Sequence, residues 1–290
     1  MKSGAEASLG PVCLTLDVEP DYGRATTTRI LDRISPFLDW LSANRIPMTA
    51  FVTGQLIAQH HPIVDQLVAA GVSVELHGHD HRAEGFGTLR DSHADEINRG
   101  TEAYVKRFGR VPSGYRAPAG VISAADLQLL ASLGYRYDSS VFPVRRKGCY
   151  DFSHFPRHPF RWMEPDLPEF PVGLLAPRIP AGLSFINLLG PTLAAVLIRR
   201  AVKRIWVPYV VDGHFHNLFP DSTALATLPA GLRGLYVLGQ WSGGFKGFRS
   251  LVDRLREAGV TLAGIHEIAS QNTAMLPGVS LAAFESRAAP

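Results

Sequence analysis

Short apolar runs alternate with helical segments along the first half of this chain, and this alternation constrains its fold more than any other feature. Residues 12–16, 47–52 and 72–76 have the length and apolar content of buried strands. Between the first two runs, apolar residues recur at helical spacing over residues 28–44, with a predicted kink at Pro36. Strands that alternate with helices through short connections predict a mainly parallel sheet with right-handed crossovers. The predicted fold class is therefore α/β.

The pattern continues with predicted strands at residues 113–116 and 206–212 and a helix at 188–205. About seven strand–helix units fit one barrel-like domain, which we expect to cover residues 1–290. Residues 139–182 interrupt the rhythm because they are rich in proline and aromatic residues. We expect this segment to be an insertion, and a loop this long in a compact domain usually serves function.

The composition excludes several other classes of protein. With 46% hydrophobic and 19% charged residues, the chain is typical of a globular rather than a disordered protein. The net charge of +3 comes from nearly balanced acids and bases, so no nucleic-acid partner is expected. Two cysteines, Cys13 and Cys149, are too few for a disulfide framework, and Cys13 is expected to be a buried free thiol.

Three histidines follow the third apolar run within five residues: His77, His79 and His81. His77 and His81 are four residues apart, so a helical turn or tight loop can bring both imidazoles to one cation. A single histidine is more often structural than a metal ligand. Three so close together, in a chain with a carboxylate pair at another strand end, favour a metal site.

The carboxylate pair is Asp17 and Glu19, directly after the first apolar run. Residues i and i+2 of a strand point to the same face, so both carboxylates can enter one pocket. Two like charges so close need a cation or a proton. The alternative is that they only cap the following turn. Two histidines and one carboxylate would make an open metal site with room for water and substrate.

The motifs in order resemble those of the polysaccharide deacetylase family, carbohydrate esterase family four. They are Asp17-x-Glu19, His77-x-x-x-His81, Arg116-x-Pro118, Asp138-Ser139-Ser140 and a late strand that contains histidine, and together they cover about residues 14–217. The resemblance implies a distorted (β/α)7-type barrel and a divalent metal. Zinc is the metal most often implied, with Co²⁺, Mn²⁺, Fe²⁺ and Ni²⁺ as alternatives. The implied reaction is hydrolysis of an acetamide, or occasionally an ester, on a sugar.

Roles follow from the resemblance. Asp17 resembles the catalytic base, and Glu19, His77 and His81 resemble the metal ligands. Arg116 would orient Asp17, while Asp138 would hold either Arg116 or the network of the catalytic histidine. His216 or His214 resembles the general acid, and we prefer His216 because it is nearer the carboxyl end of the predicted strand.

The sequence departs from the common family pattern at three places. Two adjacent aspartates are usual where Asp17-Val18-Glu19 stands, a spacing typical of a divergent branch. An aromatic residue usually follows the Arg-x-Pro motif, but here Ala119 follows Pro118, so only the Ala119 backbone N–H could hold an oxyanion. The last motif usually has one histidine, whereas His214 and His216 are two and are expected on the same face of the predicted strand. His79 and Pro118 are further candidates for contact with the substrate.

Two other functions are compatible with the sequence. In an amidohydrolase-type barrel, His77-x-His79 would be a metal pair, although that motif normally ends the first strand, which here carries carboxylates. A carbohydrate-binding relative without catalysis would keep the fold, but Asp17, Arg116 and His216 are all intact.

Location and partners rest on two segments. Residues 1–10 have no apolar core, so no signal peptide is expected and a cytoplasmic location follows.

Residues 179–198 carry no charge and precede Arg199, Arg200, Lys203 and Arg204. Prolines and glycines interrupt this run, so we expect a buried helix or a patch on the inner membrane face. The substrate would be a nucleotide-linked or lipid-linked amino sugar, with residues 179–204 favouring the lipid-linked form. Oligomeric state is left open.

Overall fold

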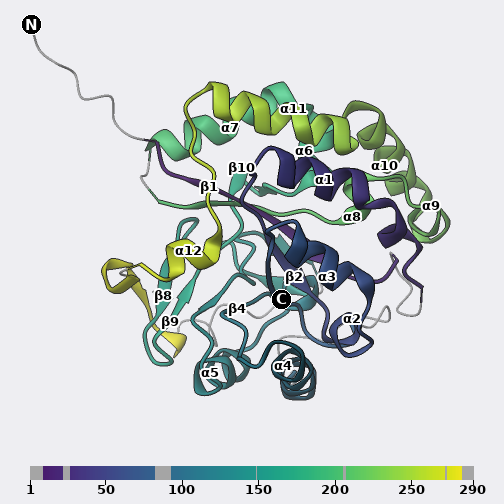
Figure 1. Ribbon diagram of the computed structural model, residues 1–290. Helices are drawn as coiled ribbons and strands as arrows, with labels where there is room; N and C mark the ends of the chain where they lie inside the picture. Colours follow the sequence, from purple (N-terminus) through teal and green to yellow (C-terminus); the bar gives the residue numbers. More distant parts are fainter. Residues whose placement is uncertain are drawn as a thin grey trace, which may run out of the picture.

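The computed structural model describes residues 9–21, 27–81, 93–147, 149–204, 207–271 and 273–282. Its centre is a curled sheet with the strand order β12-β1-β2-β3-β4-β5-β9-β8-β13, surrounded by helices (Figure 1). The strands are β1 (Val12–Val18), β2 (Thr49–Val52), β3 (Ser73–Leu76), β4 (Gly114–Tyr115), β5 (Tyr137–Asp138), β8 (Phe160–Trp162), β9 (Leu167–Glu169), β12 (Tyr209–Val211) and β13 (Gly278–Val279). Two small hairpins lie outside it: β6 (Arg145–Arg146) with β7 (Tyr150–Asp151), and β10 (Leu174–Ala176) with β11 (Ile179–Pro180).

In the first half of the chain, helices alternate with strands, and in the second half most of the helices follow one another. They are α1 (Ser35–Ala43), α2 (Gly54–Ala58), α3 (Pro62–Ala69), α4 (Ala94–Phe108), α5 (Ala124–Ser132), α6 (Leu183–Leu189), α7 (Pro191–Arg204), α8 (Phe215–Leu218), α9 (Ser222–Thr227), α10 (Ala230–Ser242), α11 (Gly244–Glu257) and α12 (Ile265–Ala269). Three short 3₁₀ helices join them: η1 (Arg29–Arg33), η2 (Pro118–Gly120) and η3 (Thr273–Met275).

The sheet closes into a barrel through the segment that follows β9. Seven strands run parallel in the order β12, β1, β2, β3, β4, β5 and β9. Val172 then bridges in parallel to Val210 of β12, and the Gly173 N–H donates to the Val210 carbonyl at 2.9 Å. The predicted single-domain (β/α)7-type fold is confirmed, and its distortion lies at β9, which is reached through the hairpin from antiparallel β8 instead of a helix.

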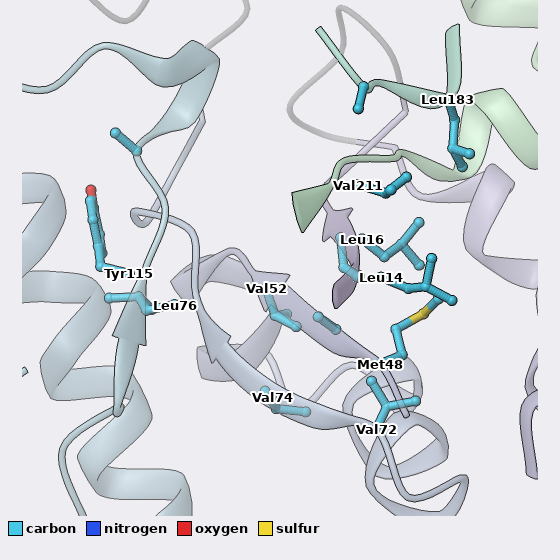
Figure 2. Packing of buried hydrophobic residues seen from close by; sticks show 14 of the residues in the cluster. Leu14, Leu16, Met48, Val52, Val72, Val74, Leu76, Tyr115, Leu183 and Val211 are labelled. Carbon is cyan, nitrogen blue, oxygen red and sulfur yellow. The ribbon is translucent and has the colours of Figure 1, made fainter. Parts of the chain in front are cut away.

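Side-chain alternation along β1 separates the barrel interior from the outer core. All seven residues of β1 are buried. Leu14 and Leu16 pack outward with Met48 and Val211 beneath the helices (Figure 2). Cys13 belongs to a second apolar cluster with Phe51 and other residues of the barrel, as the period of two requires. Asp17 lies four residues after Cys13 and therefore points to the same face of β1, so its carboxylate enters the barrel interior.

Several predicted elements change at glycine or proline. The helix predicted over residues 28–44 is divided into η1 and α1 at Ile34, as the kink at Pro36 predicted. The helix predicted over residues 188–205 is two helices, α6 and α7, because Gly190 has a φ of 77° and Pro191 begins α7. Residues 139–182 are more than an inserted loop, since β9 is a strand of the barrel. The predicted strand at 206–212 is shorter, and Trp206 lies outside the described residues.

Glycines allow α2 and α4 to approach the residues that follow β3. A Cβ on Gly100 of α4 would lie 2.8 Å from the Gly78 carbonyl oxygen and 2.9 Å from the Leu76 side chain. A Cβ on Gly54 of α2 would lie 2.7 Å from the Gly100 Cα. Backbone atoms cannot yield as a flexible side chain can, so this contact fixes where β3 ends.

We therefore predict that Gly100→Ala lowers the free energy of unfolding by about 1–3 kcal/mol, the usual cost of overpacking. Gly234→Ala is the matched control, because Gly234 also lies within a helix but a Cβ there meets nothing within 4 Å. The control should be neutral or stabilising by up to about 1 kcal/mol. Denaturant unfolding measures both, and equal effects of the two substitutions would contradict the packing described.

Candidate metal centre

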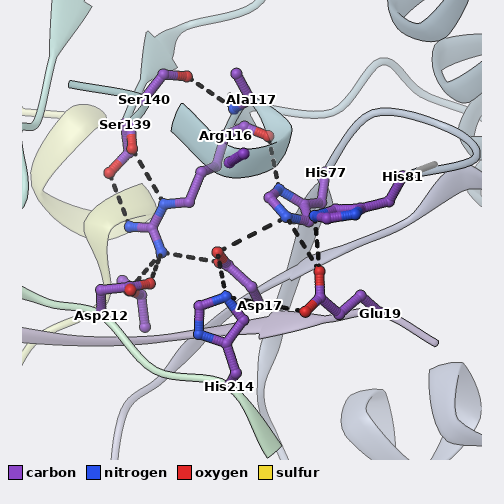
Figure 3. A network of polar contacts seen from close by, with 12 residues as sticks. Asp17, Glu19, His77, His81, Arg116, Ala117, Ser139, Ser140, Asp212 and His214 are labelled. Atoms are coloured by element: carbon purple, nitrogen blue, oxygen red, sulfur yellow. Dashed lines mark hydrogen bonds and ion pairs between the residues drawn. The ribbon is translucent and has the colours of Figure 1, made fainter. Parts of the chain in front are cut away.

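Polar side chains from β1, β3, β4 and β12 or the residues directly after them meet at the carboxyl ends of the barrel strands (Figure 3). Asp17 and Glu19 come from the end of β1, and His77 follows β3. Arg116 follows β4, and Asp212 and His214 follow β12. The carboxyl ends of parallel strands form one edge of a barrel, so residues far apart in the chain share one site.

Glu19, His77 and His81 form a group that could hold a metal ion, with ligand atoms all within 4.8 Å of one another. The Glu19 Oε2 lies 2.8 Å from the His81 Nε2 and 4.0 Å from the His77 Nε2. One ion with bonds of about 2.0–2.2 Å can bridge ligands at such separations. The structure thus brings together the three residues that were predicted as metal ligands.

The loop that carries the histidines is fixed by backbone hydrogen bonds. The Gly54 N–H donates to the Gly78 carbonyl at 2.9 Å, and one Glu96 oxygen accepts from the N–H groups of His79 at 2.7 Å and Asp80 at 2.8 Å. His81 has a φ of 45°, a left-handed conformation that is rare for a residue with a side chain. This loop conformation brings the His81 ring to Glu19.

The His77 ring is oriented as a metal ligand requires. Its Nδ1 lies 2.8 Å from the Arg116 carbonyl oxygen, which can only accept, so Nδ1 carries the proton and Nε2 keeps its lone pair. That Nε2 is buried and has no hydrogen-bond partner. A buried polar atom without a partner is costly unless something else binds it. The residues present therefore fit a divalent cation.

Arg116 is completely buried and joins the centre to the rest of the barrel. Its Nη1 donates to the Asp17 Oδ1 at 2.9 Å and to the Asp212 Oδ1 at 2.8 Å. The Nε donates to the Ser139 carbonyl at 3.0 Å, and the guanidinium carbon lies 4.3 Å from the centroid of the Phe51 ring. The predicted contact between Arg116 and Asp17 is present.

Charges around the site separate the roles of its carboxylates. Burial alone would raise the pKa of Asp17, but Arg116, with His77 and His214, lowers it below its ordinary value. Burial and the charge of Asp17 instead raise the pKa of Asp212 to about 6. Asp17 therefore remains an ionised acceptor at neutral pH, 3.7 Å from the His77 Nε2 through its Oδ2.

The same charges set the protonation of His81 and Glu19. Burial would lower the pKa of His81, but the carboxylate of Glu19 raises it to about 9. Burial opposes ionisation of Glu19, and His81 outweighs it and lowers the pKa of Glu19. A metal bound here would displace the proton of His81, so metal binding should release protons.

A second acidic group lies beside this one but is less suited to a cation. Asp17, Asp212 and His214 also bring ligand atoms within 4.8 Å of one another. Both carboxylates of this group already accept from Arg116, whose positive charge repels a cation. Within the described residues Glu19 forms no ion pair with an arginine or lysine, so its group is the better candidate.

Asp138 does not make the contact that was expected of it. Its carboxylate accepts from the Ser140 hydroxyl at 2.7 Å and shares a hydrogen bond with Glu169, whereas the second carboxylate on Arg116 is Asp212. The reason is the pairing of β5 with β9, which places Asp138 in register with Glu169. Ser140 in turn accepts from the Ala117 N–H at 2.8 Å, so Asp138 supports the backbone next to Arg116.

The preference for His216 over His214 is not supported by the geometry. His214 precedes α8, and its Nε2 lies 3.7 Å from the Asp17 Oδ2. His216 lies within α8, so the two rings do not share a strand face as predicted. Burial opposes protonation of His214, but Asp212, Glu19 and Asp17 raise its pKa, whereas burial and His214 lower the pKa of His216 to about 3. A general acid must carry a proton, which favours His214.

The remaining candidates lie at different distances from the centre. Pro118 is buried and begins η2, and Ala119 follows with a φ of 56°. No acceptor for the Ala119 N–H is found among the described residues, so it can donate to a substrate oxygen. The His79 Nδ1 lies 2.7 Å from Asp80 instead of the metal group. The His77–His79 metal pair of the amidohydrolase alternative is therefore not formed.

Sequence reasoning missed Asp212, Thr15 and Glu169, and it named Ser139 in a motif without giving it a role. The Thr15 hydroxyl accepts from the Arg116 Nη1 at 2.8 Å, and the Ser139 hydroxyl accepts from Nη2 at 3.0 Å. Asp212 had a signal, because it ends the last apolar run just before His214, as Asp17 ends the first. Glu169 had none, because it lies in the proline-rich segment where no strand was predicted.

The Asp138–Glu169 pair predicts a dependence of stability on pH. Burial and the charge of Asp138 raise the pKa of Glu169 well above its ordinary value. A raised folded-state pKa stabilises the fold below the unfolded pKa, and this contribution is lost as the pH rises through the folded pKa. The free energy of unfolding should therefore fall towards alkaline pH, by at most about 1.4 kcal/mol per pH unit.

In Glu169→Gln, which keeps a donor for Asp138 but cannot ionise, we predict that this slope disappears. Denaturant unfolding across neutral and alkaline pH measures it, with the exposed Glu102→Gln as control. Curves for wild type and Glu169→Gln that remain parallel over the whole range would show that the pair does not share a proton.

Comparison with known proteins bears on the family and the fold of the chain. Residues 6–137 match the family model for polysaccharide deacetylase. The fold is similar to that of a Mycobacterium smegmatis protein assigned to the polysaccharide deacetylases, with 21% identity, a TM-score of 0.60, and coverage of 94% of this chain and 93% of that one. It is also similar to a wild-type CE4 family pseudoenzyme from Bacillus anthracis, with 13% identity, a TM-score of 0.50, and coverage of 94% and 70%. No curated protein matches the chain in sequence.

Proposed function

We propose that this chain, whose residues 6–137 match the polysaccharide deacetylase family, is a metal-dependent hydrolase that removes an N-acetyl or other small acyl group from an amino sugar of a glycan or glycan precursor. One observation carries the proposal. An ionised carboxylate, Asp17, lies against the Glu19–His77–His81 group and is bound on its other side by Arg116. A base beside a metal group is the arrangement that amide hydrolysis by water needs.

Glu19, His77 and His81 would hold the ion, and we propose zinc. Three protein ligands are typical of catalytic zinc, which leaves a position for water or substrate. Such an ion, when bound, acts as a Lewis acid that polarises the acyl carbonyl and lowers the pKa of water. The proposal rests on the donor set and on the unsatisfied His77 Nε2.

The protein's own groups would then move the protons. Asp17 takes a proton from the water that attacks the acyl carbon, and Arg116 keeps Asp17 ionised and correctly turned for this step. The Ala119 N–H donates to the developing oxyanion. His214, whose pKa the neighbouring carboxylates raise, gives its proton to the leaving amine.

The role of Asp17 is tested by Asp17→Asn. The asparagine keeps the shape of the side chain but cannot take the proton, so kcat should fall about 10²–10⁴-fold. Zinc content, measured by mass spectrometry after dialysis, should remain at the wild-type value because Asp17 is not one of the three ligands. Full release of acetate from N-acetylated amino sugars by this variant would remove Asp17 from the mechanism.

The two late histidines are distinguished by replacing each with alanine. His214→Ala should lower kcat on an N-acetyl amino sugar about 10²–10⁴-fold, and His216→Ala should retain most activity. An aryl acetate has a leaving group that needs no proton, so the defect of His214→Ala should shrink on that substrate. If His216→Ala shows the larger loss and the aryl acetate restores it, then His216 is the acid.

One further outcome of these assays would favour the alternative of a carbohydrate-binding relative without catalysis. The Bacillus anthracis protein shows that this fold occurs without activity. Zinc bound at one equivalent with no acyl release from any amino sugar or aryl ester would place this chain with such proteins.

A further inference from the structure

The helix α10 exposes apolar side chains along most of its length. Leu232, Leu235 and Leu238 are 52%, 48% and 56% exposed, and Trp241 is 90% exposed. Gly239 is the one residue of α10 that is buried. An exposed helix of this composition usually marks an interaction surface.

Two neighbouring helices extend this surface. The Ser242 hydroxyl donates to the Asn187 carbonyl, and Gly239 faces the side chains of Asn187 and Leu188, so α10 packs on α6. Figure 1 shows α6, α7 and α10 on the same side of the barrel. We define the apolar patch as the exposed side chains Phe185, Leu189, Leu193, Val196, Leu232, Leu235, Leu238 and Trp241.

The three helices that carry the patch bear charges of one sign. α6, α7 and α10 contain no acidic residue. Their exposed basic side chains, within the described residues, are Arg199, Arg200, Lys203 and Arg233. On α7, the outward face changes from Leu193 and Val196 to the basic residues of its last turns.

We propose that α6, α7 and α10 form a docking surface for an anionic lipid bilayer. Apolar side chains would enter the boundary between headgroups and acyl chains, and the basic residues would meet lipid phosphates. Two copies of the chain that met through this surface would bring like charges together, whereas an anionic bilayer complements them. The described residues contain no single helix long and apolar enough to cross a membrane, and α6 with α7 meets these criteria only as a pair bent by 120°. Contact in the plane of the interface fits that geometry.

The inner sides of the same helices hold the residues around His214. The Gln240 Nε2 and the Tyr236 hydroxyl on α10 donate to the His216 carbonyl at 2.7 Å and 3.0 Å. The Asn187 Nδ2 on α6 donates to the Asn217 carbonyl at 2.7 Å. Docking would therefore place the edge of the catalytic centre that carries His214 close to the lipid surface, with no change in the fold.

Sedimentation with lipid vesicles tests the proposal without any measurement of catalysis. Wild type should bind vesicles of phosphatidylcholine mixed with phosphatidylglycerol, bind pure phosphatidylcholine at least about tenfold more weakly, and dissociate at high salt. Emission from Trp241 should shift to the blue on binding, because this indole leaves water; Trp241→Phe identifies its share of the signal.

Two variants and one control locate the surface. Leu238→Ser with Trp241→Ser, and separately Arg199→Glu with Arg200→Glu, should each weaken vesicle binding at least about tenfold. Val68→Ser with Met275→Ser removes apolar side chains that are 51% and 88% exposed on α3 and η3, and should bind as wild type does. Circular dichroism confirms that all variants are folded.

Two results would overturn the proposal. One is vesicle binding that is absent in wild type or unchanged in both surface variants. The other is a wild-type dimer in light scattering that becomes a monomer in Leu238→Ser with Trp241→Ser, since a second copy would then cover the patch. Because binding is measured without substrate, either result leaves the deacetylase proposal untouched, and loss of acyl release in Asp17→Asn leaves the docking surface untouched.

Discussion

The buried guanidinium of Arg116 is the interaction on which the candidate site depends. It carries a positive charge in a place with no contact with water, and such a charge is tolerated only with partners. Asp17 and Asp212 supply negative charge, while Thr15 and Ser139 accept its other hydrogen bonds. Removing the guanidinium would leave two buried carboxylates facing each other. Its backbone carbonyl also orients His77, so one residue sets both the base and a metal ligand.

The barrel makes this arrangement possible by bringing strand ends together. β1 supplies alternate side chains to the interior, where Thr15 and Asp17 reach Arg116 from β4. The parallel pairing of β12 with β1 brings Asp212 and His214 to Asp17, and the bridge from Val172 to Val210 closes the barrel on the other side of β12. The helices α6 and α10 then fix the turn after β12 through hydrogen bonds to its carbonyls. Catalytic geometry and the proposed lipid-facing surface thus share the same helices.

The sequence alone was sufficient where a short-range pattern decides the structure. The alternation of strands and helices predicted the barrel, and carboxylates and histidines at strand ends predicted a metal site. The family resemblance then assigned Glu19, His77 and His81 to that site. It was insufficient where tertiary contacts decide. β9 lies among prolines and is a strand because it pairs with β5 and β8, and α8 replaces an expected strand after Gly213. The partner of Asp138 depends on the register between β5 and β9, which no local pattern contains.

Anomalous diffraction at the zinc edge, from crystals grown with one equivalent of zinc, tests the central claim most directly. A single strong peak is expected between the Glu19 carboxylate and the Nε2 atoms of His77 and His81, with Asp17 still hydrogen-bonded to Arg116. A peak between Asp17, Asp212 and His214, or no peak in crystals of an active preparation, would contradict this account. It would show that Glu19 does not bind the metal while Asp17 accepts the proton.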